Sequence, residues 1–242
     1  MSGRDGKARS SQVPSGSASV ARKRAGAPQA SSAHGAGRAG VAAGAASGAR
    51  SGAAASRGPS EVRIVGGVWK RSKLPVADRP GLRPTPDRVR ETLFNWLGQD
   101  LNGWRVLDAF AGSGALGFEA ASRGASHVTL LEKDASLATQ LRANLKRLDK
   151  DGTVPMRIEV ADALAWMGRA ASASFDLVLL DPPFAQDLFQ RALRAAAPLL
   201  VPQGLIYLEA PEALEPPPEL GLSLWREGRA GAVHYRLFQR NG

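Results

Sequence analysis

The sequence predicts an α/β fold: a mostly parallel sheet with an antiparallel C-terminal hairpin and a β-hairpin extension at the N-terminal end. Three observations support this prediction. Strand-like apolar runs alternate with helical stretches from Arg105 onward. The run Leu177–Leu180 is apolar at every position, which is typical of a parallel strand covered on both faces. Near the end, only residues 226–232 separate two strand-like runs, and so short a connection favours an antiparallel hairpin.

The composition of the 242-residue chain changes near residue 60. Residues 1–60 consist almost entirely of Ala, Gly, Ser, Arg and Pro, with nine basic residues against a single acid, Asp5. Such a segment buries too little apolar surface to offset its ordering entropy. We therefore predict a disordered basic tail that adds weak, salt-sensitive attraction to nucleic acid, with a targeting peptide as the alternative. Residues 61–242 are nearly neutral, with 23 basic and 21 acidic residues.

The residue content excludes several classes of site. The absence of Cys excludes disulfides, cysteine-ligated metals and a catalytic thiol. The three His are far apart in the sequence, which argues against a metal centre. No apolar run approaches the ~18 residues that a membrane span needs. We expect a soluble, cytoplasmic protein without a metal.

We expect three segments: the tail at 1–60, the β-hairpin extension at 61–80 and the α/β domain at 81–242. Thr85 and Pro86 predict a helix start with Thr85 as the N-cap. An apolar stripe then runs through Val89, Leu93, Trp96 and Leu97. Further strands are expected at 106–107, 128–131, 156–160, 176–180, 205–208, 223–225 and 233–238, with helices at 115–122, 136–148 and 188–200.

A glycine-rich loop follows the first strand of the domain. Gly112, Gly114 and Gly117 match G-x-G-x-x-G, a pattern that dinucleotide sites share, and the missing Cβ atoms let backbone approach a ligand. Asp108 lies at the mouth of this loop. A carboxylate there would repel a pyrophosphate, but it suits the ammonium and sulfonium charges of S-adenosylmethionine. We therefore predict S-adenosylmethionine as the cofactor.

Two further acids follow the next strands. Glu132 can accept both ribose hydroxyls. Asp162 can accept from the adenine amino group while the Ala163 N–H donates to the ring, although Asp162 also fits a plain helix N-cap. The predicted cofactor site comprises Asp108, Ala109, Gly112, Ser113, Gly114, Glu132, Lys133, Asp162, Ala163 and Asp181.

The strand at 176–180 ends in Asp181-Pro182-Pro183-Phe184, which indicates chemistry on an amine. The exocyclic amine of a nucleobase is a poor nucleophile because its lone pair is delocalised into the ring. The Asp181 carboxylate and the Pro182 carbonyl can accept its two N–H bonds and direct the lone pair at a methyl donor. Phe184 can stack on an extruded base. We predict Asp181, Pro182 and Phe184 as the catalytic residues, with a buried turn and a core Phe as the alternative.

Basic residues concentrate between Arg63 and Arg90, just before the catalytic sheet. They can hold RNA phosphates while a base enters the pocket. The alternative is a solvated charged face with Trp69 in the core. The predicted RNA-binding residues are Arg63, Trp69, Lys70, Arg71, Lys73, Arg83 and Arg88.

Residues 62–240 resemble the bacterial family of RsmD-type 16S ribosomal RNA (guanine-966 N2) methyltransferases. The resemblance implies a Rossmann-like methyltransferase domain that methylates the exocyclic N2 amine of one guanine in 16S ribosomal RNA. The tail lies outside the match. The motifs that carry the resemblance lie at 63–70, 81–97, 108–117, 181–184 and 235–240.

The small basic footprint of the folded part predicts recognition of shape, within a partly assembled small ribosomal subunit, by a monomer. Three alternatives differ from this interpretation. An amino-methyltransferase acting on adenine or cytosine of another RNA or DNA uses the same turn. A nicotinamide oxidoreductase is disfavoured by Asp108 and by the lack of a His placed to handle hydride. A non-enzymatic RNA-binding module would need neither Asp181 nor Glu132.

Overall fold

The computed structural model describes residues 61–77, 84–183 and 188–242. The predicted tail at 1–60, Arg83 and Phe184 lie outside these described residues. No helix in the described ranges is both long and apolar enough to cross a membrane. The strands are β1 (Glu61–Arg63), β2 (Lys73–Pro75), β3 (Arg105–Asp108), β4 (His127–Glu132), β5 (Met156–Val160), β6 (Phe175–Leu180), β7 (Leu200–Ala210), β8 (Leu222–Ala230) and β9 (Val233–Arg240). The α-helices are α1 (Asp87–Trp96), α2 (Ala115–Ser122), α3 (Ala135–Leu148), α4 (Ala163–Met167) and α5 (Phe189–Ala196), and short 3₁₀ helices lie at Ala197–Leu199 and Pro218–Leu220.

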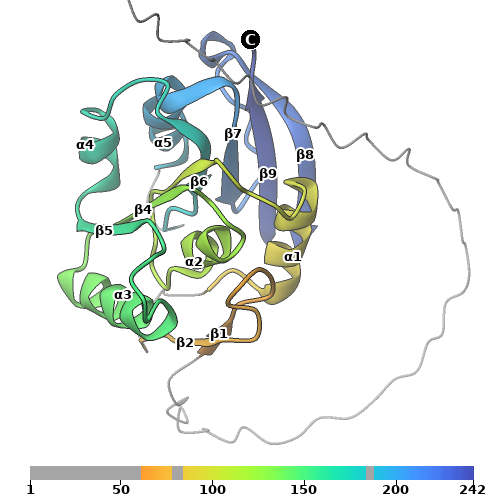
Figure 1. Cartoon of the computed structure of the whole chain (residues 1–242). Coiled ribbons are helices and arrows are strands. Elements are labelled where there is room, and N and C mark those ends of the chain that lie inside the picture. Colours follow the sequence, from red (N-terminus) through yellow and green to blue (C-terminus); the bar gives the residue numbers. More distant parts are fainter. Residues whose placement is uncertain (1–60, 78–83, 184–187) are drawn as a thin grey trace, which may run out of the picture. The chain divides into compact units, whose positions relative to one another are not determined.

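The central sheet has the strand order β5-β4-β3-β6-β7-β9-β8 (Figure 1). Strands β5, β4, β3, β6 and β7 are parallel, whereas β9 runs antiparallel to both β7 and β8. This confirms the predicted α/β fold with its antiparallel C-terminal hairpin. The chain leaves β3 towards β4 on one side and returns to β6 on the other. Ligands of such sheets bind beyond the carboxyl ends of the strands at this switch point.

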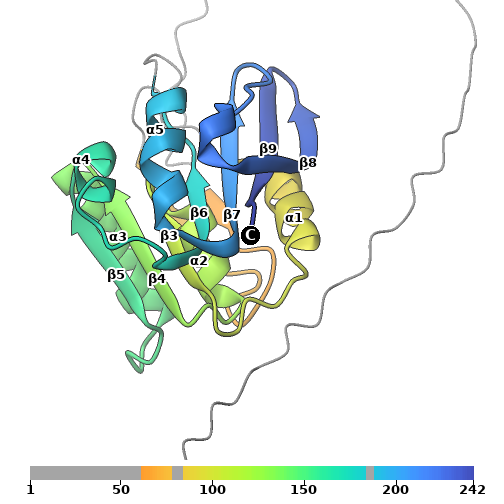
Figure 2. The same ribbon diagram turned by 90° about the horizontal axis from the view of Figure 1, so that it is seen from above.

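Helices cover both faces of the sheet (Figure 2). On one face α1, α2 and the middle and end of α3 pack in a single hydrophobic cluster with the β1–β2 hairpin. On the other face α4 and α5 pack in a second cluster. Strand β6 is buried at every position, and its residues from Leu177 to Leu180 belong alternately to the two clusters, which explains why this run is apolar without interruption.

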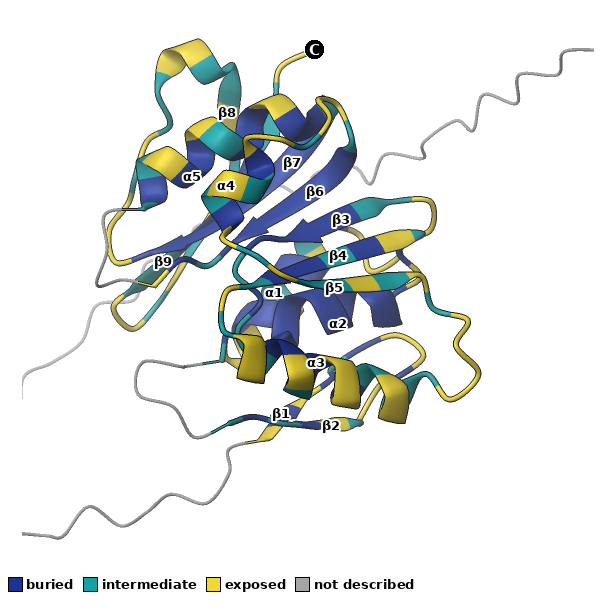
Figure 3. Cartoon of the chain, turned by 90° about the vertical axis from the view of Figure 1, so that its left-hand side faces the viewer, coloured by how far each residue is buried: buried dark blue, intermediate teal, exposed yellow. Residues whose placement is uncertain are grey.

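The β1–β2 hairpin is antiparallel, as predicted, and it packs over α2. Every residue of α2 is buried (Figure 3). The Val65 N–H donates to Glu119 of α2, and the Trp69 N–H donates to the Ser122 hydroxyl. A Cβ at Gly67, which has a φ of +73°, would lie 1.8 Å from the Ser122 carbonyl oxygen. Only glycine therefore permits this close approach of the hairpin to α2.

The structure corrects the prediction for Trp69. Its ring is buried and packs against Phe118 of α2, with the ring centroids 6.2 Å apart. The hairpin has to bury apolar surface against α2, and Trp69 supplies part of that surface. Trp69 is therefore a core residue in this structure and presents no ring face for stacking on RNA.

Three other expectations about the helices differ from the structure. Pro86, not Thr85, is the N-cap of α1, because the Thr85 hydroxyl donates to Glu209 instead of capping the helix. The short helix α4 was expected only through the alternative interpretation of Asp162 as an N-cap, and no range was predicted for it. The helix expected at 188–200 ends earlier, because Leu200 already pairs with Phe175 as the first residue of β7.

Candidate active site

Four carboxylates lie at the carboxyl ends of neighbouring parallel strands. Asp108 ends β3, Glu132 ends β4, Asp181 follows β6 and Glu209 lies near the end of β7. Side chains alternate between the faces of a strand, so each acid shares a face with the residue two positions earlier. All four of those earlier residues pack in the cluster on the α1–α3 face, namely Val106, Leu130, Leu179 and Tyr207. The fold therefore brings the four acids together above one face of the sheet.

Asp108 is almost fully buried beneath the glycine loop. Its Oδ2 accepts the Gly117 N–H at 2.9 Å. The pKa of Asp108 is raised to about 7, chiefly by burial and in addition by the charges of Glu132 and Glu209, while the Gly117 hydrogen bond acts to lower it. A Cβ at Gly117 would lie 2.7 Å from Leu130. Gly117 thus allows α2 to approach the sheet closely enough for this hydrogen bond.

Glu132 is held by backbone amides on both carboxylate oxygens. Oε2 accepts the Gly112 N–H at 2.9 Å, and Oε1 accepts the Asp134 N–H at 2.8 Å. Each oxygen keeps a further lone pair that a ribose hydroxyl can use. The side chain is therefore fixed in place before any ligand binds.

The hydrogen bonds of the loop distinguish between the two candidate cofactors. A pyrophosphate site offers free backbone N–H groups to the ligand. Here the N–H groups of Gly112 and Gly117 already donate to carboxylates of the protein. The mouth of the loop is consequently acidic. These residues fit a cationic ligand that carries ribose hydroxyls, as S-adenosylmethionine does, and they do not fit a dinucleotide phosphate.

The remaining predicted cofactor residues surround this loop. Asp162 caps α4 by accepting the Ala165 N–H at 3.0 Å, so the N-cap interpretation is confirmed, while its contact with adenine stays a prediction. The exposed Lys133 ammonium lies 3.8 Å from Asp162 Oδ2. The loop and helix backbone adjoining these groups is formed by Ala109, Ser113, Gly114 and Ala163, all of which are buried.

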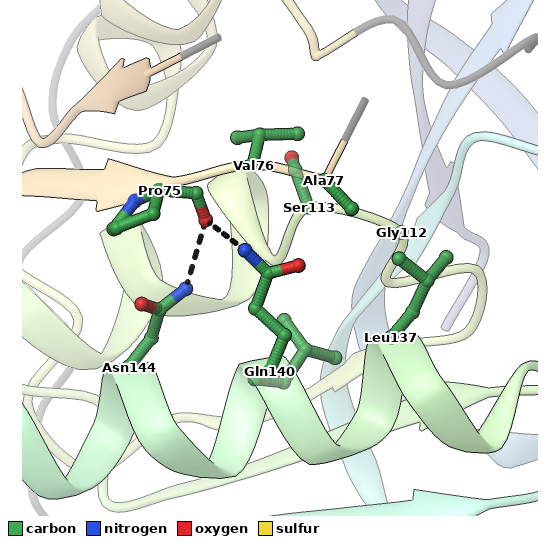
Figure 4. Close-up of a pocket in the computed structure, with 9 residues that line it drawn as sticks. Pro75, Val76, Ala77, Gly112, Ser113, Leu137, Gln140 and Asn144 are labelled. Carbon is green, nitrogen blue, oxygen red and sulfur yellow. Dashed lines mark hydrogen bonds between the residues drawn. The ribbon is translucent and has the colours of Figure 1, made fainter. Parts of the chain in front are cut away.

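The end of the β1–β2 hairpin lies beside the glycine loop (Figure 4). The Pro75 carbonyl oxygen accepts from Gln140 Nε2 at 2.8 Å and from Asn144 Nδ2 at 3.3 Å, and both donors belong to α3. A small hollow separates Val76 and Ala77 of this segment from Gly112 and Ser113. The extension therefore forms one wall next to the predicted cofactor site.

Asp181 and Pro182 continue β6 beyond the sheet. Burial raises the pKa of Asp181 well above its usual range, and the charges of Glu209 and Asp108 add to this effect. Pro182 is buried and Pro183 is exposed. Pro182 and Pro183 have no N–H, so these two residues offer carbonyl acceptors and no backbone donors. This is the arrangement expected for a site that binds an amine.

Glu209 was missed in the sequence analysis. Its Oε1 accepts from the Thr85 hydroxyl at 2.8 Å and from the Tyr207 hydroxyl at 2.9 Å. Burial raises the pKa of Glu209, while these two hydrogen bonds lower it. No motif marks this residue. The available signal was an acid placed at the end of the apolar strand Leu205–Leu208, a position where ligands of parallel sheets bind.

Comparisons with known proteins assign this architecture to a family. A family model described as "Conserved hypothetical protein 95" matches residues 62–239. The "Ribosomal RNA small subunit methyltransferase D" of Escherichia coli K12 is 44% identical over 186 residues, which are 76% of this chain and 92% of that protein. The protein of the same name from Haemophilus influenzae is 42% identical over 74% of this chain and 94% of its own length. The chain belongs to this methyltransferase family.

Solved structures agree with this assignment. One from Escherichia coli has a TM-score of 0.66 and 42% identity, and it covers 76% of this chain and 99% of its own. One from Haemophilus influenzae has a TM-score of 0.64 and 39% identity, covering 76% of this chain and all of its own. The sequence-based assignment to the RsmD-type family and to the methyltransferases is thereby confirmed.

The predicted RNA-binding residues of this family member divide into two groups. Lys70, Arg71 and Arg88 are exposed. Arg63 pairs with Asp87 at 3.2 Å, and Lys73 pairs with Glu61 at 2.7 Å, although both basic side chains remain largely exposed. All five side chains are thus solvent-exposed, and their contact with RNA phosphates stays a prediction.

Arg90 also belongs to the basic stretch, but it has a structural role. Its side chain is fully buried and contacts Glu119 of α2 at 3.2 Å. Glu119 is contacted by Arg123 as well, at 2.7 Å. Arg90 donates in addition to the Arg63 carbonyl oxygen at 2.6 Å. This buried network connects the hairpin, α1 and α2, and so it fixes the exposed basic residues relative to the site.

Proposed function

We propose that this chain transfers a methyl group from S-adenosylmethionine to the exocyclic N2 amine of a guanine in 16S ribosomal RNA. The observation that carries the proposal is the acceptor-only turn Asp181-Pro182, which lies among buried acids next to the glycine loop. Membership of a family whose relatives are named for methylation of small-subunit ribosomal RNA supports the choice of substrate.

The cofactor site consists of this chain's own acids. Asp108 balances the ammonium of the ligand, and Glu132 accepts from the ribose hydroxyls. Asp162 and Ala163 contact the adenine. S-adenosylmethionine supplies an electrophilic methyl group on a sulfonium. The protein supplies orientation, because the loop backbone and both carboxylates are already held by hydrogen bonds.

The target amine is bound by Asp181 and Pro182. Two acceptors that take its two N–H bonds favour a pyramidal nitrogen whose lone pair points away from the turn. When the nitrogen gains the methyl group it loses one of these protons, and the Asp181 carboxylate that accepts this N–H is placed to receive the proton. The pKa of the half-buried Asp181 carboxyl is raised, and an amine that donates to this carboxyl would favour its ionised form. Phe184 offers a face on which the extruded base stacks. In-line placement of amine and methyl group is the main source of the rate enhancement.

The RNA is held by the exposed basic residues of the hairpin and of α1. Phosphate contacts by Arg63, Lys70, Arg71, Lys73 and Arg88 fix the orientation of the substrate without reading its bases. We place Arg83 in the same group. This surface is small, so a partly assembled small subunit, in which folded RNA presents the target, is the preferred substrate. The enzyme acts as a cytoplasmic monomer, and residues 1–60 add non-specific attraction to RNA.

The proposal is tested with purified full-length protein, isotope-labelled S-adenosylmethionine and small-subunit particles from cells that lack the gene. After digestion to nucleosides, mass spectrometry is expected to find the label in N2-methylguanosine. Naked RNA of the same sequence should be methylated far more slowly. Label in methylated adenosine or cytidine would mean that the target base is adenine or cytosine and not guanine. Equal rates on the particle and on naked RNA would overturn the preference for the particle.

A further inference from the structure

One buried carboxylate beside the proposed target site has no role in the scheme above. Glu209 is 5% exposed. Leu180 of β6 lies opposite Leu208 of β7, so Asp181 and Glu209 are the next two residues along adjacent parallel strands. The charge of Glu209 contributes to the raised pKa of Asp181. Any amine that the Asp181 carboxylate binds will therefore lie close to Glu209.

The orientation of the Glu209 carboxylate is defined by two hydroxyls. Both Thr85, just before α1, and Tyr207, on the same strand, donate to Oε1. Within the ranges that the structure describes, no hydrogen bond ends on Oε2. Because two hydroxyls hold Oε1 in position, Oε2 of the same carboxylate is held in position as well. Oε2 is thus a pre-oriented acceptor next to Asp181.

The bases differ in what lies next to their exocyclic amine. In guanine the N2 amine is followed by N1–H, a second donor on the same edge. In adenine and in cytosine the ring nitrogen beside the amine has no hydrogen and carries a lone pair. A carboxylate oxygen attracts the first arrangement and repels the second. Two neighbouring carboxylates match the paired donors of guanine.

We propose that Glu209 Oε2 accepts the N1–H of the target guanine and thereby selects guanine over adenine and cytosine. This inference rests on the proposed function, because it takes the Asp181 turn as the site of the target amine. A purely structural Glu209 would only connect the start of α1 to β7 through Thr85. The two roles make different predictions for a base that keeps the amine but lacks N1–H.

The test uses 2-aminopurine riboside, which retains the 2-amino group and has an unprotonated N1. Small-subunit particles are assembled from RNA that carries either guanosine or 2-aminopurine riboside at the nucleotide located by mass mapping. Methyl transfer by the full chain is measured as kcat/KM on both particles. The enzymes compared are wild type, Glu209→Gln and, as the matched control, Glu212→Gln on the exposed loop after β7. 2-Aminopurine also lacks the guanine O6, but this loss affects all three enzymes alike. Comparing the enzymes therefore isolates the contribution of N1–H.

Wild type and Glu212→Gln are expected to prefer guanine by at least about 30-fold, which corresponds to one charged hydrogen bond. In Glu209→Gln the two hydroxyls hold the amide oxygen at the Oε1 position. The amide NH₂ then takes the place of Oε2 and donates to the unprotonated N1. The preference for guanine should fall below about 3-fold or reverse. Unchanged affinity for S-adenosylhomocysteine and an unchanged Tm would show that the variant is folded.

Two results would overturn the assignment. The first is a folded Glu209→Gln protein that keeps the wild-type preference. The second needs no variant: wild type that methylates 2-aminopurine as well as guanine does not read N1–H. If wild type transfers no methyl group to the guanosine particle at all, the proposed function itself fails, and that result is distinct from the other two.

Discussion

Replacing Asp108 with Asn should stabilise the free protein while weakening its binding of the cofactor. In the native fold this buried carboxyl has a pKa of about 7, against a usual value of 3.8. A raised carboxyl pKa means that the folded state binds the proton more tightly than the unfolded state. The contribution of Asp108 to stability is therefore greatest at acid pH. It is lost as the pH rises from about 4 to about 7.

The size of the effect follows from the shift. About three pKa units correspond to about 4 kcal/mol of stability lost at pH 8 relative to pH 4, as an upper limit. Asn removes this charge but can still accept the Gly117 N–H. Chemical denaturation of the variant and of wild type, without ligand, should give a stability difference that grows by about 2–4 kcal/mol in favour of Asn between pH 4.5 and pH 8.

The same variant should lose cofactor affinity, since the carboxylate is the group that balances the ligand ammonium. Calorimetry with S-adenosylhomocysteine at pH 8 should show a loss of about 1.5–3 kcal/mol for Asp108→Asn. Glu212→Gln, which removes an exposed acid on the loop after β7, serves as the control that loses one charge elsewhere. A stability difference that does not depend on pH, or wild-type affinity in the Asn variant, would refute the assigned role of Asp108.

Four further outcomes are expected. Glu132→Ala should weaken binding of S-adenosylhomocysteine by about 1–3 kcal/mol by calorimetry, and tight NAD binding by wild type would contradict the cofactor assignment. Asp181→Ala should abolish methyl transfer to RNA with nearly unchanged affinity for S-adenosylhomocysteine; near-normal turnover would mean that the turn has no catalytic role. Glu119→Ala removes the buried carboxylate that Arg90 and Arg123 share, so that Arg90 keeps only its ion pair with Asp87, and it should cost about 3–5 kcal/mol by urea denaturation, whereas a wild-type midpoint would disprove the importance of this network. Deleting residues 1–60 should barely change Tm but should lower RNA affinity with a shallower salt dependence, and a large fall in Tm would show that this segment packs on the domain.

The sheet could be predicted because short stretches of the sequence are enough to indicate its strands and their pairing. The uninterrupted apolar run of β6 and the short connection between β8 and β9 each determine a pairing pattern almost by themselves. The glycine loop and the acids that end β3 and β4 could be located for the same reason. Carboxyl ends of parallel strands meet at one edge, so consecutive motifs of the sequence become neighbours in space.

What the sequence analysis missed depends on long-range contacts. Thr85 has the residue type and position of an N-cap, yet its hydroxyl donates to Glu209, 124 residues away. Trp69 lies within a basic stretch, which made RNA binding the preferred interpretation over a core position, but its ring packs against Phe118 of α2. Arg90 belongs to the same basic stretch and is buried against Glu119. In each case the partner in the fold, and not the local pattern, determines the role of the side chain.

The central claim is transfer of a methyl group to the N2 amine of one guanine by the Asp181 turn. The most direct test maps modified nucleosides, position by position, in 16S ribosomal RNA from cells that lack the gene and carry either the wild-type chain or Asp181→Ala. We expect one N2-methylguanosine to be absent without the gene, restored by the wild-type chain and not restored by Asp181→Ala expressed at the same level. An unchanged modification map in cells without the gene, or full restoration by Asp181→Ala, would contradict the claim.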